Sequence, residues 1–205
     1  MSAAGPLPPA VVRKRRVQLV ALAMVFAGPL ALAFALYYSG HFSPAGHLNS
    51  GVLVEPPRPL PAVAAAVPGG GHLGPGFLRH KWSLVVLGRS ACATHCQQAL
   101  AATLVVERAL FQDAARMQRV LLLDAPCCES TRHTAGVTLV TAVLDDPDGR
   151  RLLEAFALAG VPAAEEGRVY LVDPLGNLMM SYPPGTEPRA LLQDLEKLLR
   201  LSRIG

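Results

Sequence analysis

Residues 84–96 read Leu84-Val85-Val86-Leu87-Gly88-Arg89-Ser90-Ala91-Cys92-Ala93-Thr94-His95-Cys96, and this stretch decides the fold. Its first four residues are aliphatic and include two β-branched side chains, which predicts a buried strand. Gly88 ends the apolar run, and a helical pattern begins at Cys92. We therefore expect a strand, a turn and a helix, with two cysteines at the start of the helix.

The two cysteines are four residues apart, and residues i and i+4 lie on one face of a helix. Their Cα atoms would be roughly 6 Å apart, so the sulfur atoms can form a disulfide or bind one soft metal ion. The partial positive charge at a helix N-terminus favours the thiolate, above all at Cys92. This chemistry requires both sulfur atoms to be exposed.

The composition indicates one domain of ordinary size and an additional membrane segment. The chain has 205 residues, of which 51% are hydrophobic, and this is enough for a packed core. Val17–Tyr38 is an uncharged run of about 22 residues, long enough to cross a bilayer as a helix. Arg13-Lys14-Arg15-Arg16 precedes it. By the positive-inside rule the N-terminus lies in the cytoplasm and the remaining chain is exported.

A cleaved signal peptide is the alternative to an anchor, because Ala31-Leu32-Ala33 and Ala33-Phe34-Ala35 resemble cleavage sites. The apolar run is longer than a usual signal-peptide core, which favours the anchor. The formal net charge is +4, and the basic cluster at residues 13–16 accounts for four positive charges. Since the rest of the chain is near neutral, we expect no nucleic-acid partner.

Four regions are predicted along the chain. They are a cytoplasmic basic tail at 1–16, a transmembrane anchor at 17–38, a linker at 39–77 and a globular domain at 78–205. Pro56-Pro57 and Gly69-Gly70-Gly71 predict that the linker is semi-rigid and contains no helix or strand.

The apolar patterns of the globular domain predict seven elements. They are a strand at 82–87, a helix at 92–114, a strand at 119–124, a helix at 151–159, strands at 168–173 and 177–182, and a helix that begins at 186–188. A short apolar piece at 137–144 lies in an otherwise irregular stretch. This order, with the cysteines at the first strand-to-helix junction, is that of the thioredoxin core, an α/β fold with a mixed sheet flanked by helices.

The anchor, the Cys92-x-x-x-Cys96 motif and the strand-turn-strand Val169-Tyr170-Leu171-Val172-Asp173-Pro174-Leu175-Gly176-Asn177 resemble the Sco/SenC family of thioredoxin-fold proteins. They are similar above all to the small membrane-anchored Sco-like proteins that accompany cytochrome c oxidase genes in proteobacteria. The resemblance covers residues 78–205. It implies a role in assembling the copper centre of the oxidase, with an oxidase subunit or another copper chaperone as partner. It also implies a single-pass protein of the inner (cytoplasmic) membrane whose C-terminal domain is periplasmic.

Sco proteins bind copper with two cysteines and a distal histidine, and Cys92 and Cys96 match the two sulfur ligands. Residues 161–167, where the histidine would stand, contain none, and Ala93 replaces a usual proline. Because a ligand is missing, we favour thiol-disulfide oxidoreductase chemistry at Cys92 and Cys96. Cu(I) binding and delivery by the same pair is the alternative. In the redox role Cys92 would be the attacking thiolate and Cys96 the resolving thiol. In the copper role they would be the first and second ligands of Cu(I).

Several alternatives remain open at the sequence level. His95 is a candidate third metal ligand, a group that lowers a thiol pKa, or an idle exposed imidazole. Cys127, Cys128 and His133 could extend the site or be plain loop residues. A non-catalytic interaction module with a structural Cys92–Cys96 disulfide is a third hypothesis for the whole domain.

Overall fold

The computed structural model describes residues 9–39, 49–89, 92–126, 138–160 and 165–202. The chain divides into two compact units, Met1–His47 and Leu48–Gly205. The first unit contains the helix α1 (Pro9–Tyr38), and its 24-residue segment Arg13–Leu36 is long and apolar enough to cross a membrane. The predicted apolar helix is therefore present, and α1 is a candidate single-pass anchor.

The second unit is built on one mixed sheet of eight strands in the order β1-β8-β7-β4-β5-β6-β2-β3. The strands are β1 (Val52–Pro59), β2 (Ala65–Ala66), β3 (His72–Leu73), β4 (Trp82–Gly88), β5 (Met117–Leu123), β6 (Leu139–Val143), β7 (Val169–Val172) and β8 (Asn177–Tyr182). β4, β5 and β6 are parallel, and β7 runs antiparallel to β4. All seven residues of β4 are buried, which makes it the central strand of the core.

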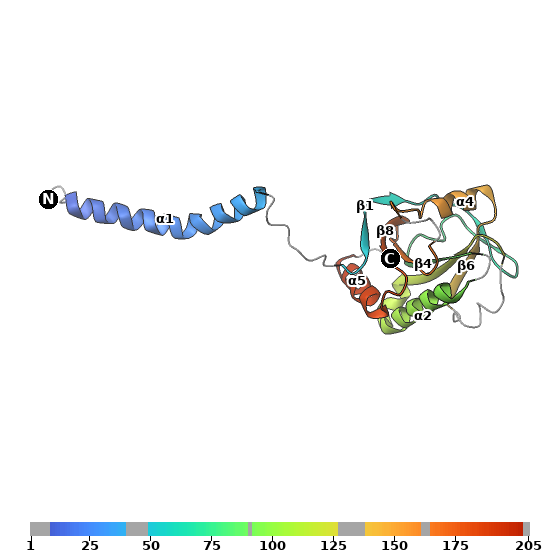
Figure 1. Cartoon of the computed structure of the whole chain (residues 1–205). Helices are drawn as coiled ribbons and strands as arrows, with labels where there is room; N and C mark the ends of the chain where they lie inside the picture. The colour runs from blue at the N-terminus through green and yellow to red at the C-terminus, as the bar shows by residue number, and fades with distance from the viewer. Residues whose placement is uncertain (1–8, 40–48, 90–91, 127–137, 161–164, 203–205) are drawn as a thin grey trace, which may run out of the picture. The chain divides into compact units, whose positions relative to one another are not determined.

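Helices cover both faces of this sheet. The helices are α2 (Thr94–Ala109), the 3-10 helix η1 (Phe111–Arg116), α4 (Pro147–Glu154) and α5 (Pro188–Leu201). Side chains alternate along a strand, so Leu84 and Val86 pack on the side of α2 and α5. Val85 and Leu87 pack on the opposite side, in a cluster with Leu152 of α4. α2 and α5 lie on one face of the sheet and α4 on the other (Figure 1). The sequence prediction of a mixed sheet flanked by helices is confirmed.

The predicted linker is wrong for the part of it that the structure describes. Residues 52–73 form β1, β2 and β3, and β1 pairs with β8 at one edge of the sheet. Proline lacks a backbone N–H and is tolerated in edge strands and at irregular pairings. Pro56 and Pro57 fit this rule, because the β1–β8 register shifts between Leu53 and Arg58. The second unit therefore begins near residue 48 instead of residue 78.

Two predicted helices differ in their bounds from the observed ones. The helix expected at 92–114 is α2 followed by η1, and α2 begins at Thr94. The helix expected at 151–159 is α4, which begins earlier because Asp146 caps it and Pro147 stands at its first position. The apolar piece at 137–144 contains β6, which pairs parallel to β5. The last three elements, β7, β8 and α5, lie where the sequence predicts them.

Candidate functional site

The two cysteines of the quoted stretch form a disulfide at the point where β4 leads into α2. Their Cα atoms are 5.2 Å apart, as the spacing of one helical turn predicts. Cys92 precedes the N-cap residue Ala93, and Cys96 lies in the first turn of α2. The side-chain amide of Gln97 donates to the carbonyl of Cys92 at 3.1 Å and so ties the turn before the helix to the helix itself.

The expectation that both sulfur atoms are exposed is wrong. Cys92 is 5% exposed, and Cys96 is fully buried. Both belong to the core between the sheet and the helices α2 and α5. Cys96 faces inward because it shares the buried side of α2 with Ala99 and Leu100. The pair is therefore asymmetric, and of the two residues only Cys92 retains any contact with solvent.

Gly88 makes room for the inner cysteine. A Cβ atom at this position would lie 2.9 Å from a methyl carbon of Leu123 and 3.4 Å from Sγ of Cys96. A larger side chain would push against the core where the disulfide packs. The glycine that ends the apolar run in the sequence thus also permits the close approach of α2 to the sheet.

Arg119 holds α2 against the sheet behind the disulfide. Its side chain is fully buried on β5 and donates to Oγ1 of Thr103 and to the carbonyl of Leu100, both on α2. It also forms an ion pair with Glu107 at 3.4 Å. Burial lowers the pKa of Arg119, and Glu107 opposes that shift. These bonds satisfy a costly buried charge and fix the helix that carries Cys96.

A second segment, residues 165–168, packs on the N-terminus of α2. Oε1 of Glu166 accepts a hydrogen bond of 3.1 Å from the backbone N–H of Ala93, between the two cysteines. Gly167 has a φ of +83°, and a Cβ atom there would lie 2.9 Å from Cβ of His95. Sequence reasoning missed this contact. The only local signal was the glycine, which both the positive φ and the close approach require.

The same segment is fixed from its inner side by Arg168. This arginine is 7% exposed and forms an ion pair with Oε2 of Glu165 at 2.6 Å. It also donates to Oγ of Ser181 on β8 at 3.2 Å. Two neighbouring glutamates thus have different partners, since Glu165 binds Arg168 and Glu166 binds the cysteine segment.

The candidate metal ligands are only partly brought together. His95 is exposed on α2, next to Gly167. No group of three or more His, Cys, Asp or Glu side chains is arranged to hold a metal ion among the residues that the structure describes. Cys127, Cys128 and His133 lie outside the described residues. Two sulfur donors are therefore the soft ligands that the described site could offer, and they must first be reduced.

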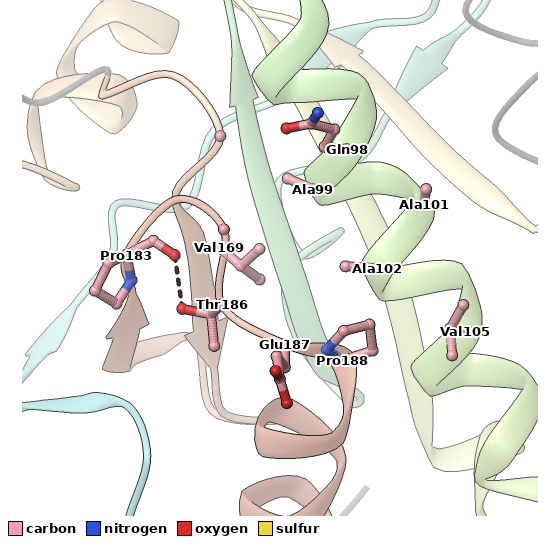
Figure 2. Close-up of a pocket in the computed structure, with 12 residues that line it drawn as sticks. Gln98, Ala99, Ala101, Ala102, Val105, Val169, Pro183, Thr186, Glu187 and Pro188 are labelled. Carbon is pink, nitrogen blue, oxygen red and sulfur yellow. Dashed lines mark hydrogen bonds between the residues drawn. The ribbon is translucent and has the colours of Figure 1, made fainter.

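A pocket of about 430 Å³ lies beside this site. One wall is the outer face of α2 with Ala101, Ala102 and Val105. The other wall holds Pro183, which follows β8, and Pro188, the first residue of α5 (Figure 2). Oγ1 of Thr186 donates to the carbonyl of Pro183 at 2.7 Å and shapes this second wall. Gly167, which contacts His95, also lines the pocket, so the pocket and the disulfide share the segment 165–168.

This arrangement defines a class of protein. A mixed sheet whose central parallel strand leads into a helix through a pair of cysteines is a thioredoxin-like domain, here with a candidate membrane helix before it. The family model described as the transmembrane-like, thioredoxin-like C-terminal domain matches residues 82–202. The match covers more than half of the chain, and the protein belongs to this family.

Solved structures show the same fold. The apo Sco1 protein from Thermus thermophilus aligns with 75% of this chain and 99% of its own, at 18% identity and a TM-score of 0.59. Yeast Sco1 with copper bound aligns with 73% of this chain and 96% of its own, at 13% identity and a TM-score of 0.58. ScoI from Bradyrhizobium japonicum with copper bound aligns with 68% and 98%, at 17% identity and a TM-score of 0.54.

These similarities confirm the predicted likeness to Sco/SenC proteins and establish it at the level of the fold. A comparison with curated proteins found no match.

Proposed function

We propose that this protein is a membrane-anchored, extracytoplasmic thiol-disulfide oxidoreductase that acts in assembly of the copper centre of cytochrome c oxidase. The observation that carries the proposal is the asymmetric disulfide at the start of α2, in which Cys96 is fully buried and Cys92 is 5% exposed. The requirement that both sulfurs be exposed is too strict, because an exchange reaction needs one sulfur that a partner can reach and one that resolves the intermediate. The Sco-like fold and the candidate anchor support the link to oxidase assembly.

The reducing direction of this chemistry starts from the reduced pair. The thiolate of Cys92 attacks a partner disulfide, and the partner sulfur that leaves takes a proton from solvent. Cys96 then attacks Sγ of Cys92, which closes the Cys92–Cys96 disulfide and releases the second partner thiol. Two electrons have passed to the partner, and an extracytoplasmic dithiol donor returns them to the pair.

Trapping the intermediate tests this proposal. In Cys96→Ser the mixed disulfide between Cys92 and the partner cannot be resolved, so we expect it to accumulate on a non-reducing gel. In Cys92→Ser the remaining thiol is buried, and no adduct should form. Equal trapping by both variants, or none by either, would contradict the assignment of Cys92 as the attacking residue.

The reduction potential separates this role from a structural disulfide. Structural bridges in secreted proteins have potentials below about −300 mV, and exchange-active pairs lie higher. We expect the Cys92–Cys96 pair to equilibrate with a glutathione buffer. A bridge that stays closed in that buffer would favour the interaction-module hypothesis.

Cu(I) delivery is the second candidate, because yeast Sco1 and Bradyrhizobium japonicum ScoI were solved with copper bound. Copper would be the cargo of the protein, and the reduced sulfurs of Cys92 and Cys96 are suitable soft ligands. Titration of the reduced protein with Cu(I) tests this candidate. Stoichiometric Cu(I) binding that is lost in Cys92→Ser would support delivery. If the reduced protein bound no Cu(I), delivery would be excluded and the redox role would be the remaining candidate.

The orientation in the membrane belongs to the same proposal. The basic cluster at residues 13–16 before the apolar segment supports an N-terminus in the cytoplasm and a periplasmic domain. A periplasm-dependent phosphatase fused after Gly205 should be active, and it should remain with the membrane fraction if α1 is uncleaved. Release of the active fusion into the soluble periplasm would favour the signal-peptide alternative.

A further inference from the structure

A single charged side chain is bound to the backbone between the two cysteines. Oε1 of Glu166 accepts the hydrogen bond from the N–H of Ala93, which follows Cys92 directly. The carboxylate therefore lies within one residue of the sulfur atom that a partner would reach. Gly167 seats the segment against His95, so this position of Glu166 is fixed by backbone packing as well.

Glu166 and its neighbour Glu165 differ in whether a positive charge compensates their carboxylate. Glu165 is neutralised by the ion pair with Arg168. No ion pair of Glu166 is present among the residues that the structure describes, and its side chain is only half-buried. The polar residues Thr94, His95 and Gln97 in the first turn of α2 are exposed, and none of them is an acid or a lysine or arginine. Glu166 consequently contributes one negative charge beside Cys92, and the exposed Arg89 is the nearest positive charge along the chain.

We propose that Glu166 positions the Cys92–Ala93 peptide and makes exchange at Cys92 selective for partners with positive charge beside their reacting sulfur. This inference rests on the proposed function, and it names the charge class of the partner. Thiol exchange is a reaction of an anionic sulfur, and a nearby carboxylate repels an approaching thiolate. A partner whose cysteine is flanked by lysine or arginine offsets that repulsion.

The reaction on which the selectivity acts is the opening of the oxidised pair. An external thiolate attacks Sγ of Cys92, the Cys92–Cys96 bond breaks, and Cys96 leaves with the electron pair and then takes a proton from solvent. A second external thiolate attacks the external sulfur of the mixed disulfide and releases the thiolate of Cys92. The external thiol is thereby oxidised to its disulfide, and the pair is reduced.

The experiment compares three small thiols on the full chain in a neutral detergent. Cysteamine is cationic, 2-mercaptoethanesulfonate is anionic and 2-mercaptoethanol is neutral, and each rate is referred to the thiolate concentration. Reduction of the pair is followed by alkylation and mass spectrometry of the peptide that contains Cys92. The variants are Glu166→Gln, which keeps a carbonyl acceptor for Ala93, and Glu154→Gln, which removes an exposed carboxylate on α4, as the matched charge control.

In the wild type we expect cysteamine to react several-fold faster than 2-mercaptoethanesulfonate. Glu166→Gln should reduce that ratio by a factor of about 3 to 10, as expected for one charge at short range near a protein surface. Glu154→Gln should leave the ratio unchanged, and salt at about 1 M should compress the wild-type ratio toward that of Glu166→Gln.

Each other outcome has a definite meaning. An unchanged ratio in Glu166→Gln, or an equal change in Glu154→Gln, would overturn the inference while the neutral thiol still reports active exchange. If 2-mercaptoethanol failed to reduce the wild type at all, the proposed function itself would be wrong. A merely structural role of Glu166 would change all three rates together and leave the charge ratio constant.

Discussion

Burial is the property of the two cysteines that their spacing could not predict. The i to i+4 spacing predicts that the two sulfurs can bond, and the Cα–Cα distance of 5.2 Å agrees, although Cys92 lies just before the first residue of α2. How deeply each sulfur is buried depends on tertiary packing, and here both pack into the core between the sheet, α2 and α5. The sequence therefore predicts the bond, whereas the difference in exposure between Cys92 and Cys96 follows from the core.

The position of Glu166 also depends on tertiary packing and could not be predicted from the local sequence. Its partner Ala93 is 73 residues away in sequence, and nothing local marks a glutamate that will accept from a distant backbone N–H. Residues 161–167 contain no histidine at the place where the family resemblance implies one. The structure places a carboxylate from this stretch beside the disulfide instead.

Tyr170 provides a stability prediction at the level of one residue. Its hydroxyl is fully buried and has no hydrogen-bond partner among the described residues, and its ring packs edge-on against Phe156. An unsatisfied buried hydroxyl is unfavourable, so Tyr170→Phe should leave the free energy of unfolding unchanged or raise it by up to about 1 kcal/mol at pH 7. Urea denaturation measures this change.

The same residue predicts a loss of stability at alkaline pH. Burial raises the pKa of Tyr170 to about 12, whereas the unfolded residue titrates near its ordinary value of 10.0. Stability is complete below that ordinary value and falls as pH rises toward the folded value, because only the unfolded chain then releases the proton. At pH 11 the loss from this residue should be about 1.4 kcal/mol.

Tyr170→Phe should abolish that part of the loss. Tyr182, whose pKa burial also raises, is still present in the variant, so the difference between the two proteins isolates Tyr170. Identical pH dependence of unfolding in wild type and variant would contradict the assignment.

At the scale of elements, patterns that are local in the chain were predictable. The aliphatic runs indicated β4 and β5, and the turn at Pro174 and Gly176 indicated the β7–β8 hairpin. The helix expected at 151–159 was predicted in kind but not in its start, where Asp146 accepts from the N–H of Gly149 as an N-cap. β1 was not predictable, because its prolines have the composition of a linker and its strand structure depends on pairing with β8.

Asp194 on α5 joins the start of the domain to its last helix. This carboxylate is 1% exposed and accepts from the N–H groups of Ser50 and Gly51 at 2.7 and 3.1 Å, and from the hydroxyl of Tyr182 at 3.4 Å. Asp194→Ala leaves these donors without their acceptor. We expect the free energy of unfolding to fall by about 3–5 kcal/mol in urea denaturation.

Asp113→Ala is the control for this substitution. Asp113 is half-exposed and pairs with Arg116 at 3.6 Å on the surface, and such pairs contribute less than about 1 kcal/mol. A similar effect of the two substitutions would contradict the special role of Asp194.

At the scale of the whole molecule, the domain boundary can be tested by truncation. Leu60, Val63 and Ala65 lie before residue 78 and belong to the core on the α4 side of the sheet. A chain of residues 48–205 should unfold cooperatively, because it retains both edges of the sheet. A chain of residues 78–205 should be less stable by about 3–6 kcal/mol, the contribution of the lost apolar burial.

Thermal denaturation and binding of a hydrophobic dye measure that difference. Equal melting temperatures of the two truncated chains would mean that residues 48–77 do not stabilise the domain, as expected for the linker predicted at 39–77. The control is the full chain in detergent, whose domain should melt with the 48–205 form.

The attachment of β1 has a mechanical consequence for the proposed arrangement in which α1 anchors the protein in a membrane. A pull on the membrane segment reaches the domain at Ser50 and Gly51, where Asp194 and the pairing with β8 resist it first. β8 and β7 stand between β1 and β4 in the sheet. In the proposed anchored protein, a load applied at Ser50 would therefore reach β1 and β8 before β4, the strand that leads to the disulfide.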